Sequence, residues 1–181
     1  PVCHSLPGKL SHSEDDWADY RAVNERFASA VCDHTGEAST IWFQDYHFAL
    51  APEIVQSRRP DATVMQFWHT PWPAPDVFRV APHHEALLRG MLGNDLLAFH
   101  VPRYRANFLR CVEQCLDDAV VDWEAGEVLR GEAVTRVEAF PLGVDAESLH
   151  RKSQQADGSF WDGFTCEHGI DADTRVALGV D

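Results

Sequence analysis

The sequence predicts an α/β protein with a Rossmann-like parallel sheet and helices on both faces. Three short apolar runs, Ile41 to Phe43, Ala62 to Trp68 and Asp95 to His100, have the length and composition of buried strands. Each run is followed by a segment with helical hydrophobic spacing. Strands that alternate with helices are typical of βαβ units, in which the sheet is parallel. At 181 residues, a single main domain with its own core is expected.

The first helix is expected to begin after Ser13. Ser13 and Asp16 resemble a capping box, and apolar side chains then recur on one helical face, which we interpret as core. These side chains are Trp17, Tyr20, Val23 or Asn24, Phe27 and Val31. Residues 1–12 hold two prolines and a glycine, which predicts an irregular lead-in.

Three further helices are predicted at residues 48–58, 83–92 and 102–115. The first of them ends at the Arg59-Pro60 step, because a residue before proline disfavours helical geometry. The second has an amphipathic pattern that stops at Gly93. Each of these helices would connect two neighbouring strands of the sheet.

The pattern changes after residue 116. Short alternating runs with glycines at 126 and 131 predict a β-hairpin, and a strand at 135–140 then returns to the sheet. Asp145 follows a tight turn and is the expected N-cap of another helix. Residues 151–174 are polar and contain glycine, so we interpret them as a linker, and residues 175–181 are expected to open a further strand.

Composition excludes several classes of function. The formal charge of −14 opposes binding to nucleic acid or to an anionic membrane. No apolar run has the length of a membrane span, and no signal peptide is recognisable, which predicts a soluble cytoplasmic protein. Five scattered cysteines without a Cys-x-x-Cys pair indicate reduced thiols.

Two polar residues at the ends of predicted strands are the candidate site. Asp45 follows the first strand and His69 the second, and the carboxyl ends of parallel strands share one edge of a sheet, where ligands bind. A loop with three prolines follows His69 and would hold this side chain rigidly. The alternative is a rigid turn in which His69 has a structural role only.

No metal and no cofactor are expected. His83, His84 and Glu85 are adjacent in the sequence. Adjacent helical residues point to different faces, and the HExxH pattern is absent. These three residues therefore do not predict a metal site.

Four sequence blocks together resemble a known family. The blocks are IWFQDYHFALAP, QFWHTPWPAPDVFRVAP, HHEALLRGMLGNDLLAFHVPRYRANFL and VEAFPLGVD. In this order and spacing, over residues 13–150, they resemble the trehalose-6-phosphate synthases of glycosyltransferase family 20. Members of this family are retaining GT-B enzymes with two facing Rossmann-like domains.

The resemblance implies the transfer of glucose from UDP-glucose to glucose 6-phosphate, which gives trehalose 6-phosphate with retention and serves osmoprotection. It also implies that Asp45 contacts hydroxyls of the acceptor and that His69 contacts the donor glucosyl unit as the catalytic histidine. No cofactor beyond these substrates is implied. Front-face attack, in which the leaving phosphate helps to deprotonate the acceptor, requires no protein nucleophile.

The resemblance further implies a division into domains. Residues 1–150 would be the acceptor-side domain without its first strands, 151–174 the linker, and 175–181 the start of the donor-side domain. The arginine and lysine that hold the donor diphosphate in the family have no counterpart here. We therefore expect an incomplete fold without transferase activity on its own, and an exposed sheet edge that could lead to a homo-oligomer.

Two alternatives stay open. The acceptor could be another phosphorylated compound such as glycerol 3-phosphate, or the protein could be a non-catalytic subunit that senses sugar phosphates. Trp68 and Trp72 stand where the family usually has an aliphatic residue and a phenylalanine. They would either reshape the acceptor cup or belong to the core.

Overall fold

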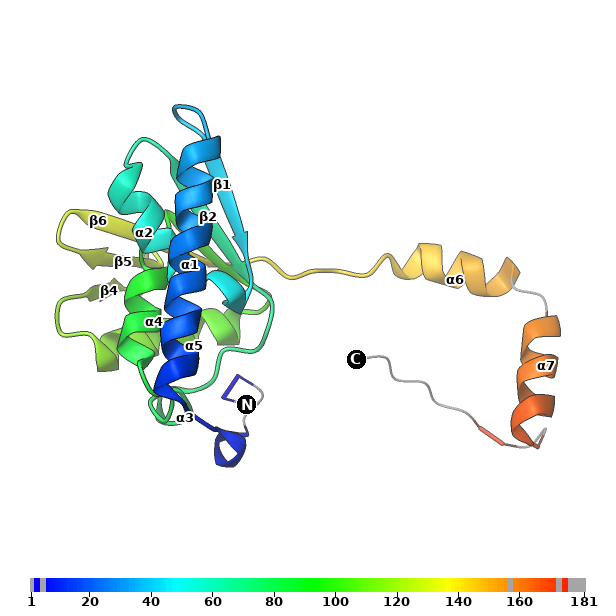
Figure 1. Ribbon diagram of the computed structural model, residues 1–181. Coiled ribbons are helices and arrows are strands. Elements are labelled where there is room, and N and C mark those ends of the chain that lie inside the picture. Colours follow the sequence, from blue (N-terminus) through cyan, green and yellow to red (C-terminus); the bar gives the residue numbers. More distant parts are fainter. Residues whose placement is uncertain (1, 4–5, 156–157, 172–173, 176–181) are drawn as a thin grey trace. The chain divides into compact units, whose positions relative to one another are not determined.

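The computed structural model describes residues 2–3, 6–155, 158–171 and 174–175, which form two units. The first unit ends at Leu142 and the second begins at Gly143. Apart from a one-turn helix at Pro75–Phe78, inside the predicted proline loop, helices and strands of the first unit follow one another as the sequence analysis predicts (Figure 1). The candidate site lies in this unit.

A six-stranded sheet forms the centre of the first unit. Its order is β1-β2-β3-β6-β5-β4, with the first four strands parallel and the last three joined as antiparallel neighbours. The strands are β1 (Thr40–Gln44), β2 (Thr63–Trp68), β3 (Leu96–Phe99), β4 (Val120–Asp122), β5 (Glu127–Arg130) and β6 (Ala133–Ala139). The predicted α/β class, with a largely parallel sheet and a hairpin excursion, is confirmed.

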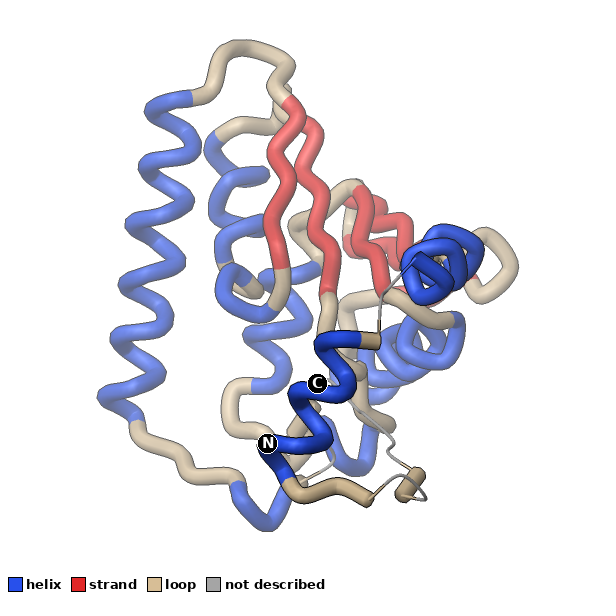
Figure 2. The backbone as a smooth tube through the Cα atoms, turned by 90° about the vertical axis from the view of Figure 1, so that its right-hand side faces the viewer, coloured by secondary structure: helices blue, strands red, loops and turns tan. Residues whose placement is uncertain are grey.

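Five α-helices belong to this unit. They are α1 (Glu14–His34), α2 (Ala51–Arg58), α3 (Pro75–Phe78), α4 (His84–Met91) and α5 (Pro102–Cys115), with short 3₁₀ turns η1 (Pro7–Lys9) and η2 (Tyr46–Phe48). In Figure 2 the long helix α1 lies outside α2, which lies nearer the strands. Helix α5 has the bounds that the sequence predicts, whereas α2 begins three residues later because η2 occupies the first turn.

The helices cover one face of the sheet, not the predicted two. Residues that pair across the strands on this face are buried, among them Phe43, Gln66, Leu97 and Val137. Along the chain, β2, β3 and β6 each join the sheet on the same side of the preceding parallel strand. Because such crossovers are right-handed, every connecting helix then lies on the same face of the sheet. Helices on the second face would need strands added beyond β1.

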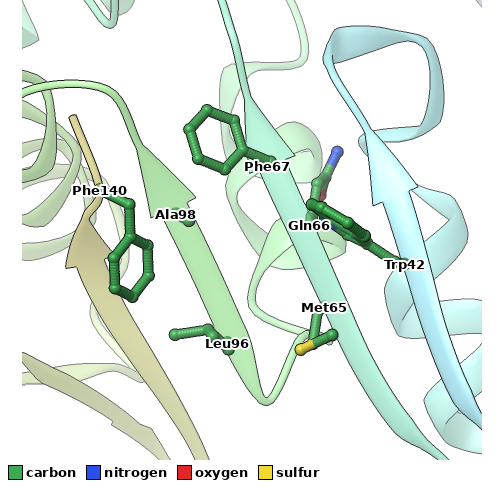
Figure 3. Close-up of a pocket in the computed structure, with 7 residues that line it drawn as sticks. All are labelled: Trp42, Met65, Gln66, Phe67, Leu96, Ala98 and Phe140. Atoms are coloured by element: carbon green, nitrogen blue, oxygen red, sulfur yellow. The ribbon is translucent and has the colours of Figure 1, made fainter. Parts of the chain in front are cut away.

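The second face of the sheet carries partly exposed apolar side chains. They line a shallow hollow of about 120 Å³ and are Trp42, Met65, Phe67, Leu96, Ala98 and Phe140, with the Gln66 backbone behind them (Figure 3). Trp42 is 62% exposed and Phe140 is 51% exposed. No described helix of the first unit covers this face.

Helix α1 begins as predicted, and its buried face includes part of the predicted stripe. The Ser13 hydroxyl accepts a hydrogen bond from Asp16 N, which confirms the predicted cap. Of the alternatives Val23 and Asn24, Asn24 is the buried one, together with Ala28, whereas Val23 and Phe27 are 43% and 49% exposed. The assignment of Phe27 to the core is wrong.

Asn24 takes the inner position because it completes the start of α2. Its Oδ1 accepts hydrogen bonds from Leu50 N and Ala51 N, each at 3.1 Å, and its Nδ2 donates to Tyr20 O and His47 O. The first amides of a helix have no partner within that helix. An amide side chain from α1 therefore satisfies them better than an apolar one would.

Trp72 belongs to the core. It is 1% exposed, its ring makes edge contacts with Trp68 and Phe108 at centroid distances of 4.9 and 5.0 Å, and its Nε1 donates to Cys111 Sγ. Of the two tryptophans that depart from the family pattern, this one is structural.

Among its described residues, the second unit contains two helices, α6 (Ala146–Gln155) and α7 (Ser159–His168). Asp145 Oδ1 accepts a hydrogen bond from Ser148 N at 2.9 Å, so the predicted N-cap is present. The stretch predicted as a linker, 151–174, thus includes the end of α6 and all of α7. Residues 176–181 of the predicted final strand lie outside the described residues, and the division at residues 150 and 174 stays a prediction.

Candidate functional site

Three strands deliver polar side chains to one edge of the sheet. Asp45, His69 and His100 are the first residues after β1, β2 and β3, and these strands are parallel neighbours. The carboxyl ends of parallel strands are where ligands bind in open α/β sheets. The structure therefore brings Asp45 and His69 together, as the sequence predicts, and adds His100.

Asp45 has a strained backbone that is supported by two buried, hydrogen-bonded side-chain amides. Its φ and ψ are 59° and −168°, a region that residues with a Cβ rarely adopt. Asp45 N donates to Phe67 O at 2.8 Å, and Gln66 Nε2 donates to Asp45 O at 2.9 Å. Asn94 Nδ2 in turn donates to Gln66 Oε1, and both amide residues are buried. These hydrogen bonds hold the turn that positions the Asp45 carboxylate.

The Asp45 carboxylate and the backbone of His69 are in direct contact. Asp45 Oδ1 accepts a hydrogen bond from His69 N at 3.3 Å. The His69 ring lies between two polar partners, with Nε2 2.7 Å from Gln44 Oε1 and Nδ1 3.2 Å from His100 Nε2. A neutral His69 that donates from Nε2 would accept from His100 through Nδ1. The imidazole is exposed and its orientation is set by these contacts.

Phe67 forms an apolar floor under both histidines. Its ring centroid is 4.7 Å from that of His69 and 4.8 Å from that of His100. All three side chains belong to the second face of the sheet, where Gln44 also lies. The two imidazoles therefore have little freedom to turn away from the edge of the sheet.

A cavity of about 470 Å³ lies at the same edge of the sheet, and neither Asp45 nor His69 is among the residues that line it. Its walls include Tyr46 and Thr70, which directly follow Asp45 and His69 in the chain, together with Trp68 and Tyr20. Trp68 Nε1 is buried and has no hydrogen-bond partner among the described residues. It is a donor that a bound polar molecule could use.

Tyr20 is a neutral wall of this cavity. Its hydroxyl donates to Tyr46 O at 2.7 Å and accepts from Ala49 N at 3.1 Å. Burial raises the pKa of Tyr20 to about 12, against smaller opposing effects of its hydrogen bonds. The phenol is therefore uncharged at neutral pH and serves to hold η2 and α2 in place.

His100 is the site residue that sequence reasoning missed. The run DLLAFH ends in histidine just as QFWH does, and Trp68 pairs with Phe99 in the sheet register. The two histidines therefore stand at equal height on neighbouring strands. A comparison of the residues that directly follow each predicted strand would have found it.

A model of glycosyltransferase family 20 matches residues 1–163. The chain belongs to this family. It is 36% identical over 109 residues to a glucosylglycerol-phosphate synthase of Picosynechococcus, which covers 60% of this chain and 22% of that protein. It is 34% identical over 160 residues to the trehalose-6-phosphate synthase of Mycolicibacterium smegmatis, with coverage of 85% and 32%. The resemblance inferred from the four sequence blocks is thus confirmed.

The fold is that of the N-terminal domain of a GT-B glycosyltransferase. An E. coli trehalose-6-phosphate synthase structure, solved with UDP-2-fluoro glucose, superposes with a TM-score of 0.81 at 22% identity, over 92% of this chain and 37% of that one. The chain spans about a fifth to a third of the length of the curated relatives named above. None of the described helices combines the length and apolar character needed to cross a membrane.

Proposed function

We propose that this chain is the acceptor-side part of a retaining glucosyltransferase that uses UDP-glucose as donor. Glucose 6-phosphate is the proposed acceptor and trehalose 6-phosphate the product. The observation that carries the proposal is the Asp45–His69 pair at the strand ends of a family 20 fold, where the next residues in the chain, Tyr46 and Thr70, line a cavity. A carboxylate accepts hydroxyl hydrogen bonds well, and an imidazole can donate or accept.

In this proposal Asp45 binds acceptor hydroxyls and His69 is the catalytic residue next to the donor glucosyl unit. The 470 Å³ cavity receives the acceptor, and the free Trp68 Nε1 supplies a donor to it. Gln44 and His100 orient the His69 ring. Positioning of the two sugars, without a protein nucleophile, then accounts for the rate enhancement. A cytoplasmic location and a homo-oligomer stay predictions.

Glycerol 3-phosphate is the second candidate acceptor. Its support is the 36% identity to a glucosylglycerol-phosphate synthase. Trp68 is 4% exposed and contributes an indole to the cavity wall. This bulk reduces the room for an acceptor and so favours the smaller molecule. A non-catalytic sugar-phosphate sensor stays the third candidate.

The test is a UDP-release assay on the product of the complete reading frame that contains these residues. UDP-glucose is supplied with glucose 6-phosphate, glycerol 3-phosphate or no acceptor. We expect release with one phosphorylated acceptor, and a loss of about 100-fold or more in kcat for His69→Ala and for Asp45→Asn. The matched control is His34→Ala, which replaces an exposed histidine at the end of α1.

Turnover that is unchanged in His69→Ala would contradict the role of this residue. No UDP release with any acceptor, together with calorimetric binding of a sugar phosphate, would favour the sensor. Preference between the two acceptors decides between the first two candidates.

A further inference from the structure

Three side chains from two segments that are distant in the sequence meet outside the Asp45–His69 site. His12 precedes α1, Glu14 is the first residue of α1, and His83 precedes α4. Glu14 Oε1 lies 2.8 Å from His12 Nε2 and 3.4 Å from His83 Nε2. All three potential ligand atoms lie within 4.8 Å of one another. We propose that His12, Glu14 and His83 bind a divalent transition-metal ion, with Zn²⁺ as the fitting occupant.

The spacing suits a tetrahedral ion. Zinc binds imidazole nitrogen and carboxylate oxygen at about 2.0–2.2 Å, which places neighbouring ligands of a tetrahedron about 3.3–3.6 Å apart. The separation between Glu14 Oε1 and His83 Nε2 matches this edge, and that between Glu14 Oε1 and His12 Nε2 is slightly shorter. A small movement of the exposed His12 ring would complete the geometry.

His83 is held in place before any ion arrives. Its ring stacks on Trp17 with centroids 4.4 Å apart and an interplanar angle of 5°. Its backbone adopts a left-handed conformation with φ of 57°, which a residue with a Cβ adopts at a cost. Its Nε2 is buried and, apart from the contact with Glu14 Oε1 at 3.4 Å, has no polar partner within the described residues. Buried polar atoms are nearly always satisfied, and an ion would satisfy this one.

The type of ligand selects the type of ion. Two imidazoles and one carboxylate suit Zn²⁺ and similar transition metals, whereas Mg²⁺ and Ca²⁺ prefer oxygen ligands alone.

An ion bound at this place would have two effects on the structure. It would connect the segment before α1 to the turn before α4, which are otherwise 70 residues apart in the chain. His12 and Trp17 also line the 470 Å³ cavity, so the ion would stand at the wall of that cavity with its fourth position open to a water or a ligand oxygen. The inference depends on the geometry of these side chains and not on the glucosyl transfer.

The test uses the full 181-residue chain, freed of metal, without a histidine tag and with its cysteines kept reduced. Calorimetry measures Zn²⁺ binding, and visible absorption of the Co²⁺ form reports a tetrahedral site. We expect one ion per chain and at least a tenfold loss of affinity in each of His12→Gln, Glu14→Gln and His83→Gln. His84→Gln is the control, because His84 Nδ1 is occupied by Ala81 O at 2.9 Å.

Two results would overturn the proposal. One is the absence of saturable binding, in which case the cluster is a hydrogen-bonded group only. The other is binding whose affinity is unchanged in His12→Gln and Glu14→Gln, as zinc bound by cysteines would show. Circular dichroism of the metal-free variants checks their fold. If His83→Gln does not fold, the affinities of His12→Gln and Glu14→Gln for Zn²⁺ decide whether the proposal holds.

Discussion

Gln66 provides the most direct test of how the fold holds the Asp45 turn. Replacing it with leucine keeps a side chain of similar size but makes it apolar, and so removes two hydrogen bonds, from Nε2 to Asp45 O and from Asn94 Nδ2 to Oε1. Asn94 Nδ2 keeps its bond to Met91 O, so the Asp45 carbonyl suffers most. Each lost bond costs about 0.5–1.5 kcal/mol, which predicts a loss of about 1–3 kcal/mol in the free energy of unfolding.

Urea denaturation followed by tryptophan fluorescence measures this change. The midpoint should fall while the slope stays constant, since the surface exposed on unfolding is similar. Met65→Leu is the matched control, because Met65 lies in the same strand on the second face of the sheet and should change stability by less than about 0.5 kcal/mol. Equal stability of Gln66→Leu and Met65→Leu would show that the buried side-chain amides do not hold the turn.

Two further predictions concern the core. Gly93→Ala should destabilise the protein by about 1–3 kcal/mol in the same assay, because the new Cβ would overlap the backbone of Glu53, whereas Gly36→Ala has open space and should be close to neutral. Burial raises the pKa of the Cys111 thiol to about 12, so native protein treated with iodoacetamide at pH 8 should be alkylated at the exposed Cys166 and not at Cys111, as mass mapping would show. Equal effects of the two glycine variants, or rapid alkylation of Cys111, would contradict these predictions.

The elements and the Asp45–His69 pair follow from local patterns. The apolar runs have strand length, proline and glycine mark the boundaries, and parallel strands must end at a common edge. That geometry places Asp45 beside His69 without any knowledge of side-chain contacts. His100 obeys the same rule and was missed only because its strand was not examined for the residue at its end.

Other features depend on tertiary contacts that periodicity does not contain. Val23 and Phe27 fit a helical apolar stripe, yet Asn24 faces inward because it satisfies the first amides of α2. Trp72 could have lined a ligand cup, but it fills the space between Trp68 and Phe108. Whether a side chain is buried depends on which element packs against it, and the packing of elements cannot be read from a single sequence.

The local sequence pattern also does not predict that all connecting helices lie on one face of the sheet. Each βαβ unit is right-handed whichever way the sheet grows, so the spacing of strands and helices is the same for one covered face or two. Only the strand order, with β1, β2, β3 and β6 added in one direction, distinguishes them. The apolar side chains of the second face follow from that order.

Backbone strain links the two proposed sites. Among the described residues, Ala38, Asp45 and His83 are the non-glycine residues with positive φ, and such conformations cost about 1–3 kcal/mol each. Glycine would avoid this cost at Asp45 and His83, but it has no carboxylate and no imidazole. Separate contacts hold each residue in its conformation, the buried Gln66 amide for Asp45 and the stacked Trp17 ring for His83. Side-chain chemistry at these two positions therefore outweighs local backbone preference, as expected of residues that bind something.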